Sequence, residues 1–180
     1  MPASINVNDR TVVHASSNGV ATTFPDVCKT PSPAGPVPIP YPNVAQSADT
    51  SQGSSDVKMD GNPIMLQGST FATSTGDEAG TAGGGVVSGQ IKGKAEFVNY
   101  SFDVTVEGKP VPRLGDPMVQ NKGGSPNTAP MPEVQPPVVV VVAGGGGGSS
   151  QAEDDEEEEP AAVKLVSLEA EGDDAEGSEA

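Results

Sequence analysis

Apolar residues occur in short groups through the first three quarters of the chain, and Gly, Pro, Asn or Asp soon interrupts each group. Between positions 24 and 105 no segment keeps apolar residues at i, i+3, i+4 and i+7 over three helical turns. The density of Gly and Pro would also end any helix that began there. This pattern predicts an all-β fold built from short strands and turns.

The clearest alternation of apolar and polar residues covers positions 99–108. Tyr100, Phe102, Val104 and Val106 are separated by single polar residues, so in a strand they would share one face. The segment predicts a half-buried strand that ends at Gly108.

A proline-rich segment lies at positions 24–43, with seven prolines in twenty residues. Four of them, Pro36, Pro38, Pro40 and Pro42, occupy every second position. Proline has no N–H to donate into a ladder, so we expect an extended or polyproline-like stretch on the outside of a sheet.

A short motif of the form acidic-Gly-x-Pro occurs twice, 47 residues apart, each time with a further Gly seven residues after the first. The two copies are Asp60-Gly61-Asn62-Pro63 with Gly68, and Glu107-Gly108-Lys109-Pro110 with Gly115. Acidic-Gly at a strand end is a hairpin signal, so each copy predicts a β-turn-β unit. Together with the proline-rich segment, the two units could form three quasi-equivalent sides. Chance similarity in a Gly-rich chain is the alternative.

The formal net charge of −16 is concentrated at one end of the chain. Residues 1–132 carry a net charge of −3, whereas residues 133–180 carry −13 and no aromatic residue. We therefore expect one domain at 1–132, a Gly-rich hinge at 143–150 and a disordered acidic tail at 151–180. The five valines at 138–142 form either a further strand of the domain or part of a linker. A short helix at 161–171 would need a partner to be stable.

This charge also excludes classes of partner. No cluster of Lys or Arg is available to neutralise phosphates, so neither nucleic acid nor an anionic membrane surface is expected to bind. The sequence shows no basic-apolar leader and no run of about 18 apolar residues, so stable membrane insertion is not expected and export would depend on another machine.

Candidate catalytic groups are few. The chain has one His, His14, and one Cys, Cys28. The two could form a nucleophile pair if the fold brings them together, but no third orienting group is evident. The Gly-rich loop at 80–85 lacks the Lys-Ser/Thr ending of a phosphate-binding loop, so a simple turn is expected there.

The second repeat resembles the signature of the PAAR family. Pro110 and Arg113 match the ends of the Pro-Ala-Ala-Arg tetrapeptide, Val111 and Pro112 replace the two alanines, and Gly-Asp follows. The wider order of motifs, over about residues 20–130, is closer to the PAAR-like branch. The residues that carry the resemblance are Phe24, Pro25, Asp26, Cys28, Pro38, Pro40, Pro42, Gly61, Pro63, Gly76, Asp77, Glu78, Gly108, Pro110, Arg113, Gly115 and Asp116.

This resemblance implies a small β cone that caps the trimeric, VgrG-like spike protein of a contractile injection system such as the type VI secretion apparatus. The protein would assemble in the bacterial cytoplasm, leave with the spike and have no enzymatic activity. The acidic tail could dock an adaptor or an effector.

Typical members hold zinc near the apex with three His and one Cys. Residues 118–124 contain no His, so no metal and no other cofactor are expected, and the apex would be held by packing and hydrogen bonds. The alternative is a small delivered effector that uses Cys28 and His14. A third reading is a solvated β domain without a spike partner.

Overall fold

The computed structural model describes residues 5–137. Their regular structure consists of β-strands and one short 3₁₀ helix at Ser47–Asp49. The strands, in chain order, are β1 (Asn6–Val7), β2 (Arg10–Thr11), β3 (Val20–Thr30), β4 (Val37–Gln46), β5 (Thr50–Ser51), β6 (Lys58–Met59), β7 (Asn62–Pro63), β8 (Thr70–Phe71), β9 (Ser74–Thr75), β10 (Gly84–Gly85), β11 (Lys94–Phe97), β12 (Thr105–Val106), β13 (Lys109–Pro110), β14 (Pro117–Lys122) and β15 (Met131–Val134). The prediction of an all-β fold is confirmed.

Nine of these strands form one antiparallel sheet. Its order is β5-β8-β11-β14-β15-β3-β4-β9, and β10 pairs with β3 beside this path. The main apolar core includes Phe71 and Phe97, whose rings meet edge to face with centroids 6.1 Å apart. Val13, Met65 and Met118 complete the large members of this core and are fully buried. The sheet thus encloses a small core that draws on residues from both halves of the domain.

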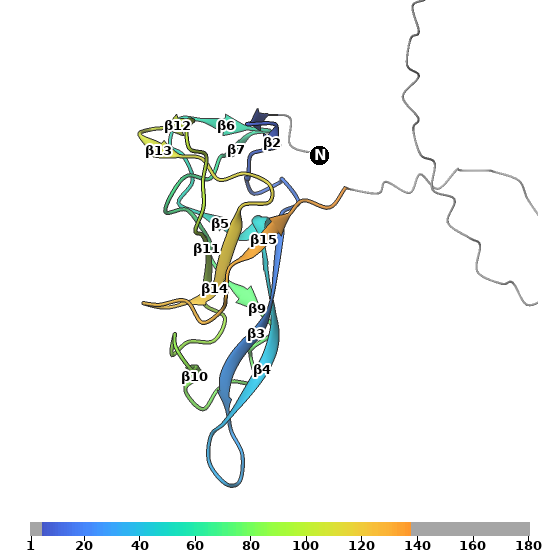
Figure 1. The fold of residues 1–180 in the computed structure, drawn as a ribbon, viewed down its shortest axis with the longest axis vertical. Coiled ribbons are helices and arrows are strands. Elements are labelled where there is room, and N and C mark those ends of the chain that lie inside the picture. Colours follow the sequence, from blue (N-terminus) through green and yellow to red (C-terminus); the bar gives the residue numbers. More distant parts are fainter. Residues whose placement is uncertain (1–4, 138–180) are drawn as a thin grey trace, which may run out of the picture. The chain divides into compact units, whose positions relative to one another are not determined.

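The longest element is the β3–β4 ribbon, which runs to one end of the domain in Figure 1. Its register shifts between Thr23 and Asp26, where β3 carries one extra residue relative to β4. Before this bulge Ala21 and Thr23 are buried, and after it Asp26 and Cys28 are buried. Side chains alternate between the two faces of a strand, so the inward-facing residues before the bulge have odd numbers. The extra residue shifts this alternation by one, and the inward-facing residues after the bulge have even numbers. The bulge therefore turns Asp26 and Cys28 into the interior.

The proline-rich segment is the outer strand of this ribbon. β4 pairs with β3 from Val37 to Gln46, and within the described residues only Val44 and Ala45 pair with β9 on its other side. Backbone N–H groups of alternate residues point to the same side of a strand, so prolines at every second position leave all the donors facing one neighbour. The predicted place on the outside of a sheet is confirmed, although the segment is a paired β-strand and not a free polyproline stretch.

Three two-residue hairpins lie together at the other end of the domain (Figure 1). They are β1–β2, β6–β7 and β12–β13. Each turns through two residues with positive φ: Asn8-Asp9 (52° and 60°), Asp60-Gly61 (50° and 78°) and Glu107-Gly108 (52° and 72°). Positive φ at both central residues is the geometry of the tight turn that suits the right-handed twist of hairpins. Both predicted β-turn-β units are confirmed.

The three hairpins are related by matching contacts. In each, a backbone N–H just after the second strand donates to the carbonyl seven residues earlier: Val12 to Ile5, Ile64 to Val57 and Val111 to Val104, at 3.2, 3.2 and 3.4 Å. The three donors also belong to one buried apolar cluster, which Met59 and Leu66 complete. This shared path and shared core give the end of the domain a pseudo-threefold character.

One assignment in the predicted threefold was wrong. The third side is the β1–β2 hairpin and not the proline-rich segment, which belongs to the large sheet. Its turn, Asn8-Asp9, has neither Gly nor a following Pro. Asn and Asp are among the non-Gly residues that adopt positive φ most readily, so the turn forms without the Gly signal.

The predicted strand at 99–108 was also wrong over most of its length. Only Thr105–Val106 forms a strand, and the Phe102 side chain is 87% exposed. Val104 N–H donates to Ser101 Oγ at 3.1 Å, which bends the chain just where the apolar alternation would need it straight. The alternating segment therefore forms a turn at 101–104, followed by β12, the first strand of the β12–β13 hairpin.

The expected domain boundary at 132 falls inside β15, which pairs with β14 and β3. The strand expected at 138–142, the hinge at 143–150, the tail at 151–180 and its helix at 161–171 all lie outside the described residues. Over the described part of the chain there is no helix with the length and apolarity to cross a membrane.

Candidate functional site

The matched signature residues Arg113 and Asp116 form a buried ion pair. Arg113 Nε lies 3.1 Å from Asp116 Oδ2, and both side chains are at most 5% exposed. The backbone N–H of Arg113 donates to the same oxygen at 2.8 Å, and Asp116 N–H donates to the Arg113 carbonyl at 2.9 Å. Gly115, with φ of +83°, provides the tight turn that brings the two side chains together.

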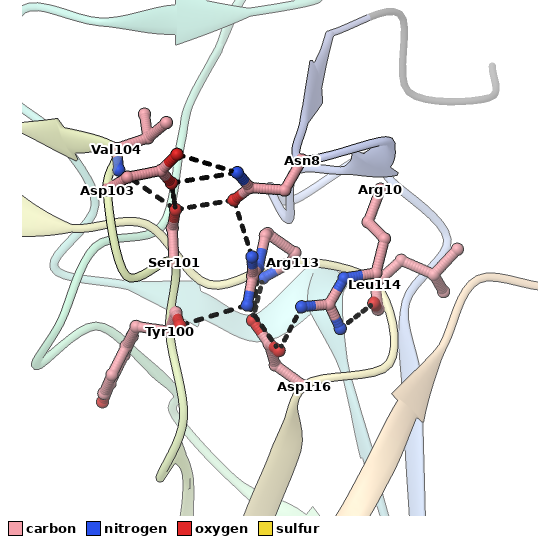
Figure 2. A network of polar contacts seen from close by, with 9 residues as sticks. All are labelled: Asn8, Arg10, Tyr100, Ser101, Asp103, Val104, Arg113, Leu114 and Asp116. Carbon is pink, nitrogen blue, oxygen red and sulfur yellow. Dashed lines mark hydrogen bonds and ion pairs between the residues drawn. The ribbon is translucent and has the colours of Figure 1, made fainter.

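The first hairpin completes this pair, as Figure 2 shows. Arg10 approaches Asp116 Oδ1 at 2.9 Å and donates to the Leu114 carbonyl at 3.2 Å. Asn8, in the turn of the same hairpin, accepts from Arg113 Nη1 at 2.6 Å. A buried guanidinium and carboxylate are costly unless their remaining donors and acceptors are bonded, and these contacts satisfy them.

The network continues outward to the segment before β12. Asn8 Nδ2 donates to both oxygens of Asp103, at 2.9 and 3.2 Å, and Ser101 Oγ lies 2.7 Å from Asn8 Oδ1. Ser101 Oγ also lies 2.9 Å from Asp103 Oδ1. The hydrogen bonds that Asp103 accepts from Asn8 and Ser101 hold its pKa below its usual range. The Arg113 network therefore joins the first hairpin to the third across about 100 residues of sequence.

A second polar cluster surrounds Asp26 beyond the β3 bulge. Three side-chain amides reach its carboxylate: Asn43 at 2.7 Å, Asn121 at 3.4 Å, and Asn127 in a short contact. Asp26 is fully buried. A carboxylate with several N–H donors can be buried at little cost, so Asp26 anchors segments from β3, β4 and β14.

Cys28 and Asp77 lie beside Asp26. Cys28 Sγ is 3.6 Å from Asp26 Oδ1 and 3.7 Å from Asp77 Oδ2, and Asp77 also accepts from the Lys92 N–H at 3.0 Å. Burial, and next the nearby carboxylates Asp26 and Asp77, raise the pKa of Cys28 to about 12. Burial also raises the pKa of Asp77. The thiol therefore stays protonated at neutral pH and acts as a weak donor.

Asp26, Cys28 and Asp77 are the residues of the described part that could hold a metal ion, with potential ligand atoms within 4.8 Å of one another. They do not fit the zinc site of three His and one Cys that the PAAR resemblance implies. The single His has other neighbours, and the remaining groups around Cys28 are carboxylates and amide N–H donors.

His14 is fully buried in a separate set of contacts. Its Nδ1 lies 3.2 Å from Ser16 Oγ, and its Nε2 lies 3.6 Å from Asp60. Burial lowers its pKa, an effect that Asp60 partly opposes. His14 and Cys28 share no partner among these polar contacts, and both are inaccessible. The structure therefore does not assemble the nucleophile pair considered from the sequence.

The other residues that carry the resemblance lie in three kinds of place. The bulge of β3 holds Phe24, 62% exposed, and Pro25; β4 holds Pro38, Pro40 and Pro42; and the hairpins hold Gly61, Pro63, Gly108 and Pro110. In the remaining motif, the Gly76 N–H donates to Glu78 Oε2 at 2.8 Å, while Asp77 points into the Asp26 cluster. The motif residues thus form two polar clusters and the turns and strands that hold them.

Sequence reasoning missed the partners of these motifs. Asn8 and Arg10 in the first hairpin, and Asn127 near the end of the domain, belong to no recognisable pattern. Asn43 and Asn121 lie in matched segments but had no assigned role. A cluster of amides converging on one buried Asp has no spacing signature, because its members are far apart in sequence.

Residues 19–129 match the model of the toxin PAAR-like domain. The chain belongs to this family. A relative, the DNase toxin Tse7 of Pseudomonas aeruginosa, is 37% identical over 138 residues, which cover 73% of this chain and 36% of the relative. The chain thus spans about a third of the length of that relative. No solved structure matches the chain.

Proposed function

We propose that this chain is a non-enzymatic tip protein that caps the trimeric spike of a contractile injection system, such as the type VI secretion apparatus, and is exported with it. The observation that supports this most is the pseudo-threefold set of hairpins. A trimer presents three equivalent surfaces around its axis, and a single chain can meet all of them only if it offers three similar surfaces itself.

The residues best suited to this contact occupy equivalent positions in the three hairpins. Ile5 and Val57 are 46% and 37% exposed, and Val104 is half-buried. Phe102, close to Val104, is the most exposed large apolar side chain among the described residues. Exposed apolar groups that recur around an axis favour burial against a partner with the same symmetry.

The test is a pull-down, followed by sizing, of the full chain with the trimeric spike protein encoded in the same genome. We expect one copy of this chain per spike trimer. Replacing Val57 and Phe102 by Asp should weaken the complex at least tenfold without changing the melting temperature. In the matched control, Val86 and Val87 are replaced by Asp. Both valines are exposed but lie outside the three hairpins, so these changes should leave binding unchanged. Absence of a complex at micromolar concentrations would overturn the proposal.

The similarity to a DNase toxin suggests a second function, that of a delivered effector. We infer that the shared domain serves delivery and does not itself cut DNA. Residues 1–132 have a net charge of −3, which does not favour phosphates, and the candidate metal group within residues 5–137, Asp26, Cys28 and Asp77, is fully buried. The test incubates the purified full chain with supercoiled plasmid and Mg²⁺. Nicking that disappears with Asp77→Ala would contradict this inference.

The acidic segment at 151–180 is proposed to dock an adaptor or an effector. A chain that lacks residues 143–180 should keep its spike complex and lose the adaptor or effector from the pull-down. Loss of the spike complex in the truncated chain would instead place residues 143–180 in the spike contact.

A further inference from the structure

The amide groups around Asp26 have fixed orientations. Asn121 Oδ1 accepts from the Gly93 N–H at 3.0 Å, and its Nδ2 donates to the Gln90 carbonyl at 2.9 Å. An amide that is bonded to a backbone N–H on one side and a backbone carbonyl on the other cannot be reversed without losing both bonds. Its Nδ2 therefore faces Asp26 and Cys28, at 3.4 and 3.6 Å.

Asn127 is held in the same way. Its Oδ1 accepts from the Val87 N–H at 2.8 Å and the Ser88 N–H at 3.3 Å, while its Nδ2 donates to the Val27 carbonyl at 3.0 Å. The same nitrogen contacts Asp26. Backbone groups thus select the donor end of this second amide for the carboxylate.

Asn43 is oriented through a serine. Ser74 Oγ donates to the Gly93 carbonyl at 2.7 Å, so it can only accept from Asn43 Nδ2, which lies 3.0 Å away. That nitrogen also donates to Asp26 Oδ2 at 2.7 Å. All three amides therefore present N–H groups, and no oxygen, to the centre of the cluster.

This arrangement suits an anion and opposes a cation. A metal ion beside Asp26 would face the positive ends of three amide dipoles. Asn121 and Asn127 could offer it an oxygen only by breaking their backbone bonds, and Asn43 only by breaking the bonds from its Nδ2 to Asp26 and Ser74. We propose that the Asp26 carboxylate, bound by Asn43, Asn121 and Asn127, replaces a metal ion as the cross-link at this end of the domain. The fold is then independent of metal.

If the proposal is correct, Asp26 contributes more to stability than Cys28, the reverse of what a zinc site would require. In a zinc site the Cys is a ligand, and its loss releases the metal. Here Cys28 makes only long, weak contacts through its sulfur, as donor to Asp26 and Asp77 and as acceptor from Asn121 and Asn127. Asp26, by contrast, is the common acceptor for segments from three parts of the chain. Cys28 should therefore be nearly dispensable for stability, and Asp26 should not. This holds whether or not the protein binds a spike.

The test uses the full chain, made without a metal-binding tag in medium with added zinc. Its melting temperature is measured before and after dialysis against EDTA, and again after Zn²⁺ is restored, with bound metal counted by mass spectrometry. We expect changes below about 1 °C. Zinc that EDTA removes without moving the melting temperature lies outside the cluster and agrees with the proposal. A fall of more than about 5 °C that Zn²⁺ restores would overturn it.

Three variants give an independent readout. Asp26→Asn should lower the melting temperature by roughly 6–8 °C, because charge-assisted bonds are lost and an amide N–H then faces other N–H groups. Cys28→Ser should lower it by less than about 3 °C. Asp49→Asn, at an exposed carboxylate, controls for the change of charge. Equal losses for Cys28→Ser and Asp26→Asn would contradict the proposal. If Asp26→Asn does not fold, the EDTA result and Cys28→Ser decide it.

Discussion

Arg113 and Asp116, three residues apart, form a buried pair in which Arg113 Nε lies 3.1 Å from Asp116 Oδ2. The pair is not self-contained. Arg10 adds a second guanidinium to Asp116, and Asn8 accepts from Arg113, so the first hairpin completes a motif that belongs to the third. The signature residues Arg113 and Asp116 therefore link the β1–β2 hairpin to the segment that follows the β12–β13 hairpin.

Arg113 should be among the residues most important for stability. Arg113→Ala leaves the buried Asp116 without its main partner, and we expect a loss of about 3–5 kcal/mol in the free energy of unfolding. Arg113→Lys should recover only part of this, because an ammonium cannot match the planar fork that reaches Asp116, Asn8 and the Tyr100 carbonyl. Urea denaturation measures both. Lys58→Ala, at an exposed position, is the control, and a similar loss there would rule out this account.

Gly76 should tolerate no side chain, for two reasons that can be separated. Its φ is +133°, and a Cβ would lie 2.0 Å from the Pro42 carbonyl oxygen. Gly35 also has positive φ, +108°, but a Cβ there meets nothing within 4 Å. We expect Gly35→Ala to cost about 1–2 kcal/mol from backbone strain alone. Gly76→Ala should cost about 3 kcal/mol or more, measured by thermal unfolding. Equal costs would mean that the close approach does not matter.

Glu133 should make stability fall as pH rises. Burial raises its pKa to about 8, and its Oε1 would lie 2.1 Å from a Cβ at Gly19, so the carboxyl packs tightly in the interior. The folded chain keeps this proton up to about pH 8, whereas the unfolded chain releases it near its ordinary pKa of 4.5. Between these values the unfolded state binds fewer protons, so each pH unit removes up to about 1.4 kcal/mol of stability.

Glu133→Gln should abolish this dependence, because the amide mimics the protonated acid. Urea denaturation at pH 5, 6.5 and 8 should show the variant gaining on the parent chain as pH rises. Parallel stability curves for the two chains would show that Glu133 is not buried as a neutral acid.

Cys28 should be unreactive in the folded protein. It is fully buried, and its pKa of about 12 leaves almost no thiolate at pH 8. A thiol-specific reagent at pH 8 should react with native chain at least about 100-fold more slowly than with chain unfolded in guanidinium. Fast reaction of the native thiol would reopen the idea of Cys28 as a nucleophile.

Several features were readable from local pattern because local geometry alone determines them. Two acidic-Gly turns predicted two hairpins, since two adjacent residues with positive φ need little else. Prolines at every second position predicted an extended stretch on the outside of a sheet, since proline removes a donor wherever it stands. The resemblance of residues 20–130 to PAAR-like proteins also pointed to the family to which the chain belongs.

Other features depended on bonds made by particular side chains. Asn8-Asp9 forms the third hairpin although it lacks Gly, because the segment completes the apolar cluster and the Arg113 network. The alternation at 99–108 predicted a strand, but Ser101 takes the Val104 N–H and bends the chain. In both cases a side-chain bond between specific partners decided the backbone, and such bonds leave no periodic signal.

By itself the sequence determined the β class, the two acidic-Gly turns, the place of the proline-rich segment on the outside of a sheet and the separation of charge between 1–132 and 133–180. Each of these follows from what a residue does to its own backbone or its own charge. Only the tertiary structure decided that a bulge turns Asp26 inward to meet Asn43, Asn121 and Asn127, and that Arg113 joins the first and third hairpins. These contacts join residues that are far apart in the sequence, so they depend on how the whole domain packs.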